Sequence, residues 1–143
     1  MAGVDELFPP SELLQMLPEC DFVILAVPLS PETRGLIGET ELKAMKPTAY
    51  IINTARGPVI KQDVLIQALK GGWIAGAALD VFEAEPLPPE SELWKLPNVI
   101  ISSHSAGLWE RHTAAATELF CENLRRFLTG KELLNLVDKE RGY

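Results

Sequence analysis

Hydrophobic residues along the chain gather in four short runs, and each run ends at a proline, a polar residue or a loop. The runs cover residues 22–27, 49–53, 73–79 and 98–102. They are continuous, without alternation with polar residues, which is typical of parallel strands that are buried on both faces. The pattern therefore predicts four strands, and the first two are expected to be buried.

Segments with helical spacing of apolar residues separate or follow these runs. A short helix is predicted over 11–18 with Ser11 as its cap, a second over 39–46, and a third from near Asp63. The longest, over 109–128, carries an inner stripe that includes a histidine at position 112. Strands alternating with helices predict an α/β fold with a mainly parallel sheet and right-handed crossovers.

The composition is that of a globular protein and argues against two classes of partner. The 143 residues are 47% hydrophobic and 23% charged, with a net charge of −7. This acidic balance, with no cluster of lysines and arginines, argues against nucleic acid. The apolar runs are far shorter than a bilayer span, and residues 1–7 have none of the features of a signal peptide. We expect a cytoplasmic chain with no membrane partner.

The cysteine pattern argues against a metal or disulfide framework. Cys20 and Cys121 are far apart in the chain and have no C-x-x-C spacing. We expect two buried, reduced thiols and no metal ligands.

Polar or conformationally special residues follow each predicted strand. Ligands of open parallel sheets bind outside the carboxyl ends of the strands. The residues to consider there are Pro28, Thr54-Ala55-Arg56, Asp80 and Ser103-His104-Ser105. Three ionisable side chains would then share one edge of the sheet, which indicates a functional site.

A dinucleotide-binding domain normally opens with a strand, a G-x-G-x-x-G turn and a helix whose N-terminus binds the pyrophosphate. No G-x-G-x-x-G occurs in these 143 residues. If the chain belongs to a dinucleotide enzyme, we expect it to carry only the second half of the fold.

Four motifs in order, within residues 27–36, 53–57, 76–87 and 103–107, resemble the D-isomer-specific 2-hydroxyacid dehydrogenases. This family includes glyoxylate/hydroxypyruvate reductases, D-lactate dehydrogenases and 3-phosphoglycerate dehydrogenases. The resemblance implies the second half of a Rossmann-like doubly wound parallel sheet, followed by a long C-terminal helix.

The resemblance also implies a domain division. Residues 1–107 would be the C-terminal part of the dinucleotide-binding domain. Residues 108–143 would form a helix and tail that in relatives pack back on the substrate domain. Family members are more than twice as long, so the chain resembles a C-terminal fragment of one.

Carried over by resemblance, the catalytic residues are Arg56, Glu85 and His104. A guanidinium can bind a carboxylate through two hydrogen bonds and polarise a neighbouring carbonyl. An imidazole can protonate the carbonyl oxygen, and a carboxylate beside it fixes its tautomer. Glu85 is preferred to Glu83 because it directly precedes Pro86 in the matching motif.

The resemblance implies NAD or NADP as cofactor and leaves the choice between them open. Asp80 would accept the nicotinamide carboxamide, and Pro28 would lie near the adenosine. The remaining cofactor-binding residues implied are Thr54, Ala55, Arg56, His104, Ala106 and Gly107. Ser103 stands where the family commonly has proline.

Each of these residues also has a simpler interpretation when it is taken alone. Arg56 could form a surface ion pair, His104 could be a loop histidine, and Asp80 could cap a turn. Glu83 is expected to face solvent. The motif context favours the functional interpretation of the first three.

Three functions follow as hypotheses. The first is part of an oxidoreductase that transfers a hydride between NAD(P)H and a small 2-keto or 2-hydroxy acid, of the glyoxylate or hydroxypyruvate class. The second is a non-catalytic half-domain that self-associates, and the third is a nucleotide-sensing corepressor-like module. A homodimer is expected because exposed sheet edges favour pairing with a second copy.

Overall fold

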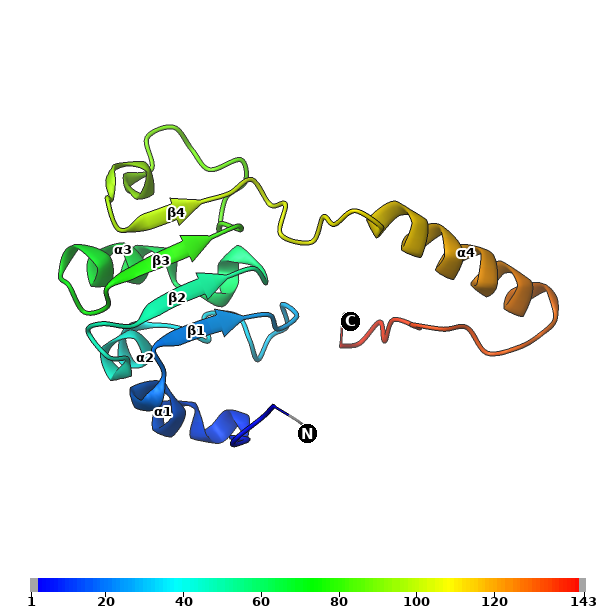
Figure 1. Cartoon of the computed structure of the whole chain (residues 1–143), viewed down its shortest axis with the longest axis horizontal. Helices are drawn as coiled ribbons and strands as arrows, with labels where there is room; N and C mark the ends of the chain where they lie inside the picture. Colours follow the sequence, from blue (N-terminus) through cyan, green and yellow to red (C-terminus); the bar gives the residue numbers. More distant parts are fainter. Residues whose placement is uncertain (1–2, 142–143) are drawn as a thin grey trace. The chain divides into compact units, whose positions relative to one another are not determined.

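The structure is a computed structural model, and it describes residues 3–141. The chain divides into two compact units, residues 1–103 and residues 104–143. The first unit contains the sheet, and the second contains the long helix α4 (His112–Leu128) (Figure 1).

A parallel sheet of four strands organises the first unit. The strands are β1 (Phe22–Leu25), β2 (Tyr50–Asn53), β3 (Gly76–Leu79) and β4 (Val99–Ile101), and they lie side by side in sequence order. Their last residues stand in one register row: Leu25, Asn53, Leu79 and Ile101. The predicted α/β fold with a parallel sheet is confirmed, and the residues that follow all four strands emerge at one edge.

Short helices connect the strands. The α-helices between strands are α2 (Glu39–Ala44) and α3 (Gln62–Lys70). Two 3₁₀ turns, η3 (Gly57–Val59) and η4 (Glu92–Lys95), lie in the connections before α3 and before β4. The predicted helix from near Asp63 is confirmed, because α3 begins one residue earlier and ends at the pair of glycines.

The predicted N-terminal helix over 11–18 is wrong in its detail. The segment is broken into η1 (Pro10–Glu12), α1 (Leu13–Met16) and η2 (Leu17–Glu19), and Ser11 caps none of them. Prolines lie at the start of both 3₁₀ turns, where their missing N–H groups and fixed φ favour short turns over a continuous helix.

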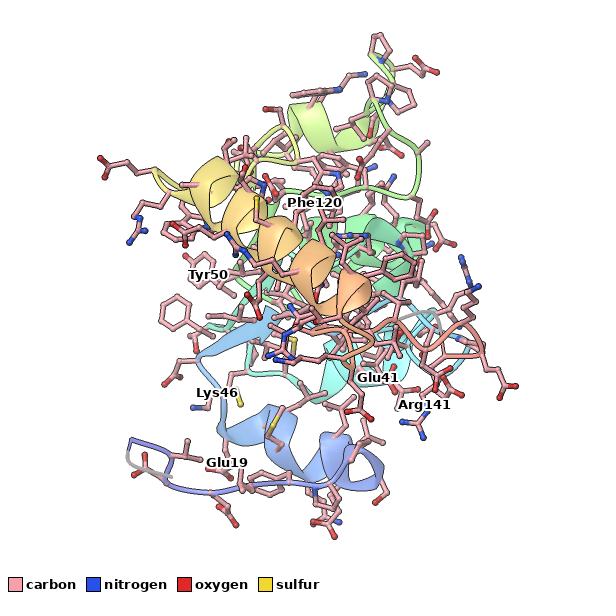
Figure 2. All side chains as sticks on the ribbon, turned by 90° about the vertical axis from the view of Figure 1, so that its right-hand side faces the viewer. Glu19, Glu41, Lys46, Tyr50, Phe120 and Arg141 are labelled. Atoms are coloured by element: carbon pink, nitrogen blue, oxygen red, sulfur yellow. The ribbon has the colours of Figure 1, made fainter. Side chains whose placement is uncertain are left out.

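A lysine ties this N-terminal segment to the first strand. Lys46 Nζ donates to the Glu19 carbonyl at 2.9 Å and to Asp21 Oδ1 at 2.8 Å. The hydrogen bond with Asp21 is the main reason that the pKa of Lys46 lies above its ordinary value. Figure 2 labels Lys46 and Glu19 at this junction.

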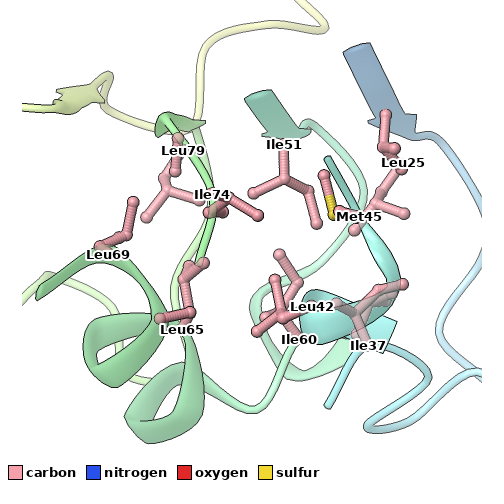
Figure 3. Close-up of a cluster of buried hydrophobic side chains, with 14 of the residues drawn as sticks. Leu25, Ile37, Leu42, Met45, Ile51, Ile60, Leu65, Leu69, Ile74 and Leu79 are labelled. Carbon is pink, nitrogen blue, oxygen red and sulfur yellow. The ribbon is translucent and has the colours of Figure 1, made fainter. Parts of the chain in front are cut away.

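The hydrophobic core lies on one face of the sheet, between the strands and the two connecting helices. Figure 3 shows Leu25, Ile51 and Leu79 from the strands pointing toward Leu42 of α2 and Leu65 of α3. All five side chains are buried. Removing such apolar side chains from water is the main term that stabilises this unit.

The prediction that the first two strands are buried on both faces is wrong, whereas β3 is buried apart from one half-buried residue. β1 alternates exposed and buried residues. On the face away from the core, Phe22 is 65% exposed, Tyr50 44% and Ile100 72%. We call this surface the open face; a groove of about 650 Å³ runs along it, lined by Phe22, Tyr50, Ile52, Ala78, Val99 and Ile100.

The order of the strands explains the open face. Each strand lies beside the one that precedes it in the chain, so every step across the sheet goes in the same direction. Right-handed crossovers that step in one direction place their helices on the same face. Both α2 and α3 therefore cover the core face, and among the described residues of the first unit no helix covers the other face.

In the second unit, α4 presents exposed apolar side chains, including Phe120, Leu124 and Phe127. The prediction that His112 is packed on an inner stripe is wrong, because His112 is exposed at the first turn. None of the helices in residues 3–141 has the length and apolar character that a membrane span requires.

The two cysteines are free, as expected, but each is half-buried rather than buried. The Cys20 thiol donates to the Met16 carbonyl at 3.4 Å. Cys121 lies on α4, and no residue of that helix is buried.

Candidate functional site

Loops that leave the carboxyl edge of the sheet carry the predicted site residues of the first unit. Thr54, Ala55 and Arg56 follow β2, and Asp80 follows β3 directly. Because the strand ends stand in one register row, these loops begin next to one another. The sheet thus places the loops of Arg56 and Asp80 together.

A buried asparagine shapes the loop that carries Arg56. Asn53 is 1% exposed. Its Oδ1 accepts from the Ala55 N–H at 3.0 Å, and its Nδ2 donates to the Arg56 carbonyl at 3.1 Å. These two bonds form a side-chain turn that reverses the chain immediately after β2. The loop backbone is therefore held from within the core.

The Arg56 side chain itself is exposed. Its Nη1 donates to the Ala55 carbonyl at 2.7 Å. Among residues 3–141, no carboxylate forms an ion pair with it. A guanidinium without a carboxylate partner can bind an anion through its remaining N–H groups.

A buried carboxylate lies at the end of β3. Asp80 is 4% exposed, and its Oδ1 accepts from the Ser102 hydroxyl at 2.6 Å. Its N–H donates to the Asn53 carbonyl at 3.0 Å, which joins the ends of β3 and β2. A buried carboxylate needs hydrogen-bond donors. Ser102, just after β4, supplies one of them.

Glu85 is exposed, and its Oε1 accepts from the Phe82 N–H at 2.9 Å. Glu83, which precedes it by two residues, is exposed as predicted but is not simply solvated. Its Oε1 accepts from the Gln62 N–H at 3.1 Å, and its own N–H donates to Gln62 Oε1 at 3.3 Å. This reciprocal pair joins the Glu85 loop to the first residue of α3.

The loops of Arg56 and Glu85 touch backbone to backbone at Gly57. A Cβ built on Gly57 would lie 1.9 Å from both the carbonyl carbon and the oxygen of Phe82, and 2.5 Å from the Glu83 nitrogen. Only a residue without a side chain permits this approach. Gly57 therefore sets the spacing between the two loops.

The loop after β1 contains Pro28, which is exposed. Its carbonyl accepts from the Thr33 hydroxyl at 2.6 Å, and the same hydroxyl accepts from the Ser30 N–H at 2.8 Å. The threonine thus closes this loop on itself.

The remaining predicted site residues belong to the second unit. His104 is exposed and has φ +54°, in the left-handed region. A non-glycine residue there is uncommon and marks a backbone that its surroundings impose. Ala106 and Gly107 are exposed in the following turn.

The predicted site residues of the two units carry polar groups of different chemistry. Arg56 offers an anion-binding guanidinium, Asp80 a buried hydrogen-bond acceptor, Glu85 a carboxylate and His104 an imidazole. The structure brings the loops of the first three together within the first unit.

Three residues that support the site were not singled out from the sequence as functional. They are Asn53, Gln62 and Ser102. A buried polar residue at the end of an apolar run was the available signal for Asn53. Gln62 and its partner Glu83 are 21 residues apart in the chain, and Ser102 and its partner Asp80 are 22 residues apart.

Comparison with known proteins shows the family of the chain. Residues 4–106 match the sequence profile of the D-isomer specific 2-hydroxyacid dehydrogenase, NAD binding domain. A glyoxylate reductase of Korarchaeum cryptofilum is 48% identical over 128 residues, which are 90% of this chain and 39% of that protein. The chain thus spans about two fifths of the length of this relative.

Solved structures show the same similarity. A D-isomer specific 2-hydroxyacid dehydrogenase from Xanthobacter autotrophicus Py2, in complex with NADPH and MES, aligns with a TM-score of 0.85 and 44% identity. The alignment covers 93% of this chain and 54% of that one. An NADPH-dependent glyoxylate/hydroxypyruvate reductase from Sinorhizobium meliloti, in complex with NADP and sulfate, aligns with a TM-score of 0.87 and 32% identity. This alignment covers 95% of this chain and 44% of that one.

The profile match covers well over half of the chain, and the aligned structures reproduce its parallel sheet. The chain belongs to the D-isomer specific 2-hydroxyacid dehydrogenase family, and residues 4–106 correspond to its NAD-binding domain.

Proposed function

We propose that this chain is part of an oxidoreductase that transfers a hydride between NAD(P)H and a small 2-keto acid of the glyoxylate or hydroxypyruvate class. The observation that carries the proposal is the pair of loops at the carboxyl edge of the sheet. One presents the exposed guanidinium of Arg56, and the other presents Asp80 and Glu85. The similarity to proteins named glyoxylate reductase supports the substrate class.

In this proposal Arg56 binds the substrate carboxylate through two hydrogen bonds and polarises the adjacent carbonyl. His104 donates a proton to the carbonyl oxygen as the hydride arrives at the carbonyl carbon. Glu85 orients the imidazole and fixes its tautomer. In the reverse direction the neutral imidazole takes the hydroxyl proton of the 2-hydroxy acid.

The residues present fit the nicotinamide end of the cofactor. The buried carboxylate of Asp80 is an acceptor for the two N–H groups of a carboxamide. We assign Pro28 to the adenosine side, and Thr54, Ala55, Ala106 and Gly107 to the nicotinamide side. A bound reduced nicotinamide would supply the hydride.

The proposal predicts that NADH binds to the 143-residue chain and changes the fluorescence of its tryptophans along a saturable curve. In a whole enzyme that contains this chain, the His104→Ala variant is expected to lose at least about a hundredfold in glyoxylate reduction with little loss of cofactor affinity, because it lacks the proton donor. His112→Ala is the matched control, since His112 is an exposed histidine of the same unit with no assigned role. Absence of saturable binding up to millimolar NADH would overturn the proposal for this chain.

We further propose that the partner of the chain is a second copy of itself. The open face supports this, because a contiguous apolar surface in water favours association. We expect light scattering at micromolar concentration to give the mass of a dimer, and Ile100→Lys, which puts a charge on the open face, to give a monomer. A monodisperse monomer of the unmodified chain would contradict self-association. Dimers that bind no NADH would favour the non-catalytic alternative.

A further inference from the structure

We propose that Gln62 and Glu83 are positioning residues, which hold the loop of Glu85 against the loop of Arg56. The inference rests on the proposed function, because it takes Arg56 and Glu85 as site residues. It concerns two side chains that touch neither substrate nor cofactor in that proposal. We call the pair the Gln62–Glu83 clamp.

The clamp is a closed ring of two hydrogen bonds between side chain and backbone. The Gln62 N–H donates to Glu83 Oε1 at 3.1 Å, and the Glu83 N–H donates to Gln62 Oε1 at 3.3 Å. Gln62 is the first residue of α3, so its N–H has no partner within the helix. A carboxylate is the preferred acceptor at that position, because the N-terminus of a helix carries partial positive charge.

The clamp is coupled to Glu85 through the residue next to Glu83. Phe82 is 7% exposed and anchored in the core, and its N–H donates to Glu85 Oε1 at 2.9 Å. Two successive amides therefore point to different acceptors, one in α3 and one in the Glu85 side chain. A shift of the Glu83 backbone moves the peptide that orients the Glu85 carboxylate.

The clamp is also coupled to Arg56. Gly57, the next residue after Arg56, lies directly against the Phe82 carbonyl and the Glu83 nitrogen. The chain from Gly57 to Gln62 is short and partly helical, since η3 forms its first half. The segment from Gly57 to Gln62 therefore contacts the Glu85 loop at both of its ends, through the glycine contact at Gly57 and through the clamp at Gln62.

A purely stabilising role of Glu83 at the helix N-terminus is the alternative explanation. It predicts that removing the carboxylate weakens the whole unit evenly. The positioning role predicts instead that the amides at Phe82 and Glu83 lose protection while the rest of the sheet keeps it. Amide hydrogen exchange separates the two, because it measures opening residue by residue.

The test is amide exchange of the full 143-residue chain, followed by NMR, in Glu83→Ala and Gln62→Ala. We expect the Phe82 amide to exchange about tenfold faster in each variant, as the loss of one hydrogen bond of ordinary strength would give. The Ala77 amide, which donates to the Asn98 carbonyl between β3 and β4, reports the sheet and is expected to stay within about twofold. The carboxyl carbon resonance of Glu85 is expected to move in the same variants.

Asp63→Ala is the matched control, because Asp63 is an exposed acid in the first turn of α3 that forms no ion pair within residues 3–141. It removes similar charge from the helix N-terminus and leaves the clamp intact. Glu83→Gln keeps an acceptor oxygen and is expected to restore most of the protection. Phe82 exchange equal in Glu83→Ala and Asp63→Ala would overturn the proposal. An equal acceleration of exchange at the Ala77 amide in Glu83→Ala and Gln62→Ala would also overturn it. Neither readout needs cofactor or activity, so failure here is separate from failure of the proposed function.

Discussion

Replacing Gly57 by alanine is expected to lower the free energy of unfolding by about 3 kcal/mol, the upper range for overpacking in a well-packed region. The added Cβ would lie 1.9 Å from two backbone atoms of Phe82. Side-chain neighbours can rotate away from such a contact, but a carbonyl group in a loop that is anchored by a buried phenylalanine cannot. The Arg56 and Glu85 loops must then move apart.

Chemical denaturation of Gly57→Ala measures this effect. Gly107→Ala is the control, because nothing lies within 4 Å of the Cβ that it would add. We expect the control to change stability by less than about 0.5 kcal/mol, as for most surface substitutions. A Gly57→Ala chain within about 1 kcal/mol of the unmodified chain would show that the two loops are not in the contact described.

The general fold was accessible from the sequence because its signal is strong. Four continuous apolar runs with helical segments between the first three are the pattern of a parallel sheet, and the four strands lie where the runs predict them. The strands are shorter than the runs: β3 begins at Gly76, whereas the apolar run begins at Trp73. Trp73 follows a glycine turn, and its N–H bonds to the Ala68 carbonyl of α3, so it closes the helix instead of starting the strand.

The open face could not be predicted from the same signal. Apolar residues such as Phe22 and Ile100 are equally apolar whether or not a helix covers them. Their exposure follows from the order of the strands, which depends on long-range pairing. Periodicity along the chain carries no information about that order.

For the candidate site, the sequence singled out the residues that we propose carry the chemistry, but not the residues that hold their loops in place. Arg56, Asp80 and Glu85 follow strands or stand in a recognisable motif. Ser102 and Gln62 act through hydrogen bonds to residues distant in the chain, and their types suit many surface positions. The left-handed backbone of His104 was likewise not indicated by its neighbours in the sequence.

Asn53→Ala is expected to cost about 3 kcal/mol of stability: about 1 for each of two lost hydrogen bonds, and about 1 more for the donor and acceptor left without a partner. Asn53 is 1% exposed, and its side chain holds the Ala55 N–H and the Arg56 carbonyl. Water cannot take its place without opening the end of β2. The Arg56 loop is expected to lose its turn in the same step.

Two variants separate this local effect from general loss of packing. Asn53→Asp keeps the acceptor for Ala55 but removes the donor to Arg56 and buries a charge, so its Ala55 amide should stay protected from exchange while stability falls. Asn98→Ala removes a half-buried amide, bonded to the Ala75 carbonyl at 3.1 Å, on the opposite edge of the sheet from Arg56. It should lower stability and leave the Ala55 amide protected. If Ala55 stays protected in Asn53→Ala as well, the asparagine does not form the turn, and the Arg56 loop must be held by the glycine contact alone.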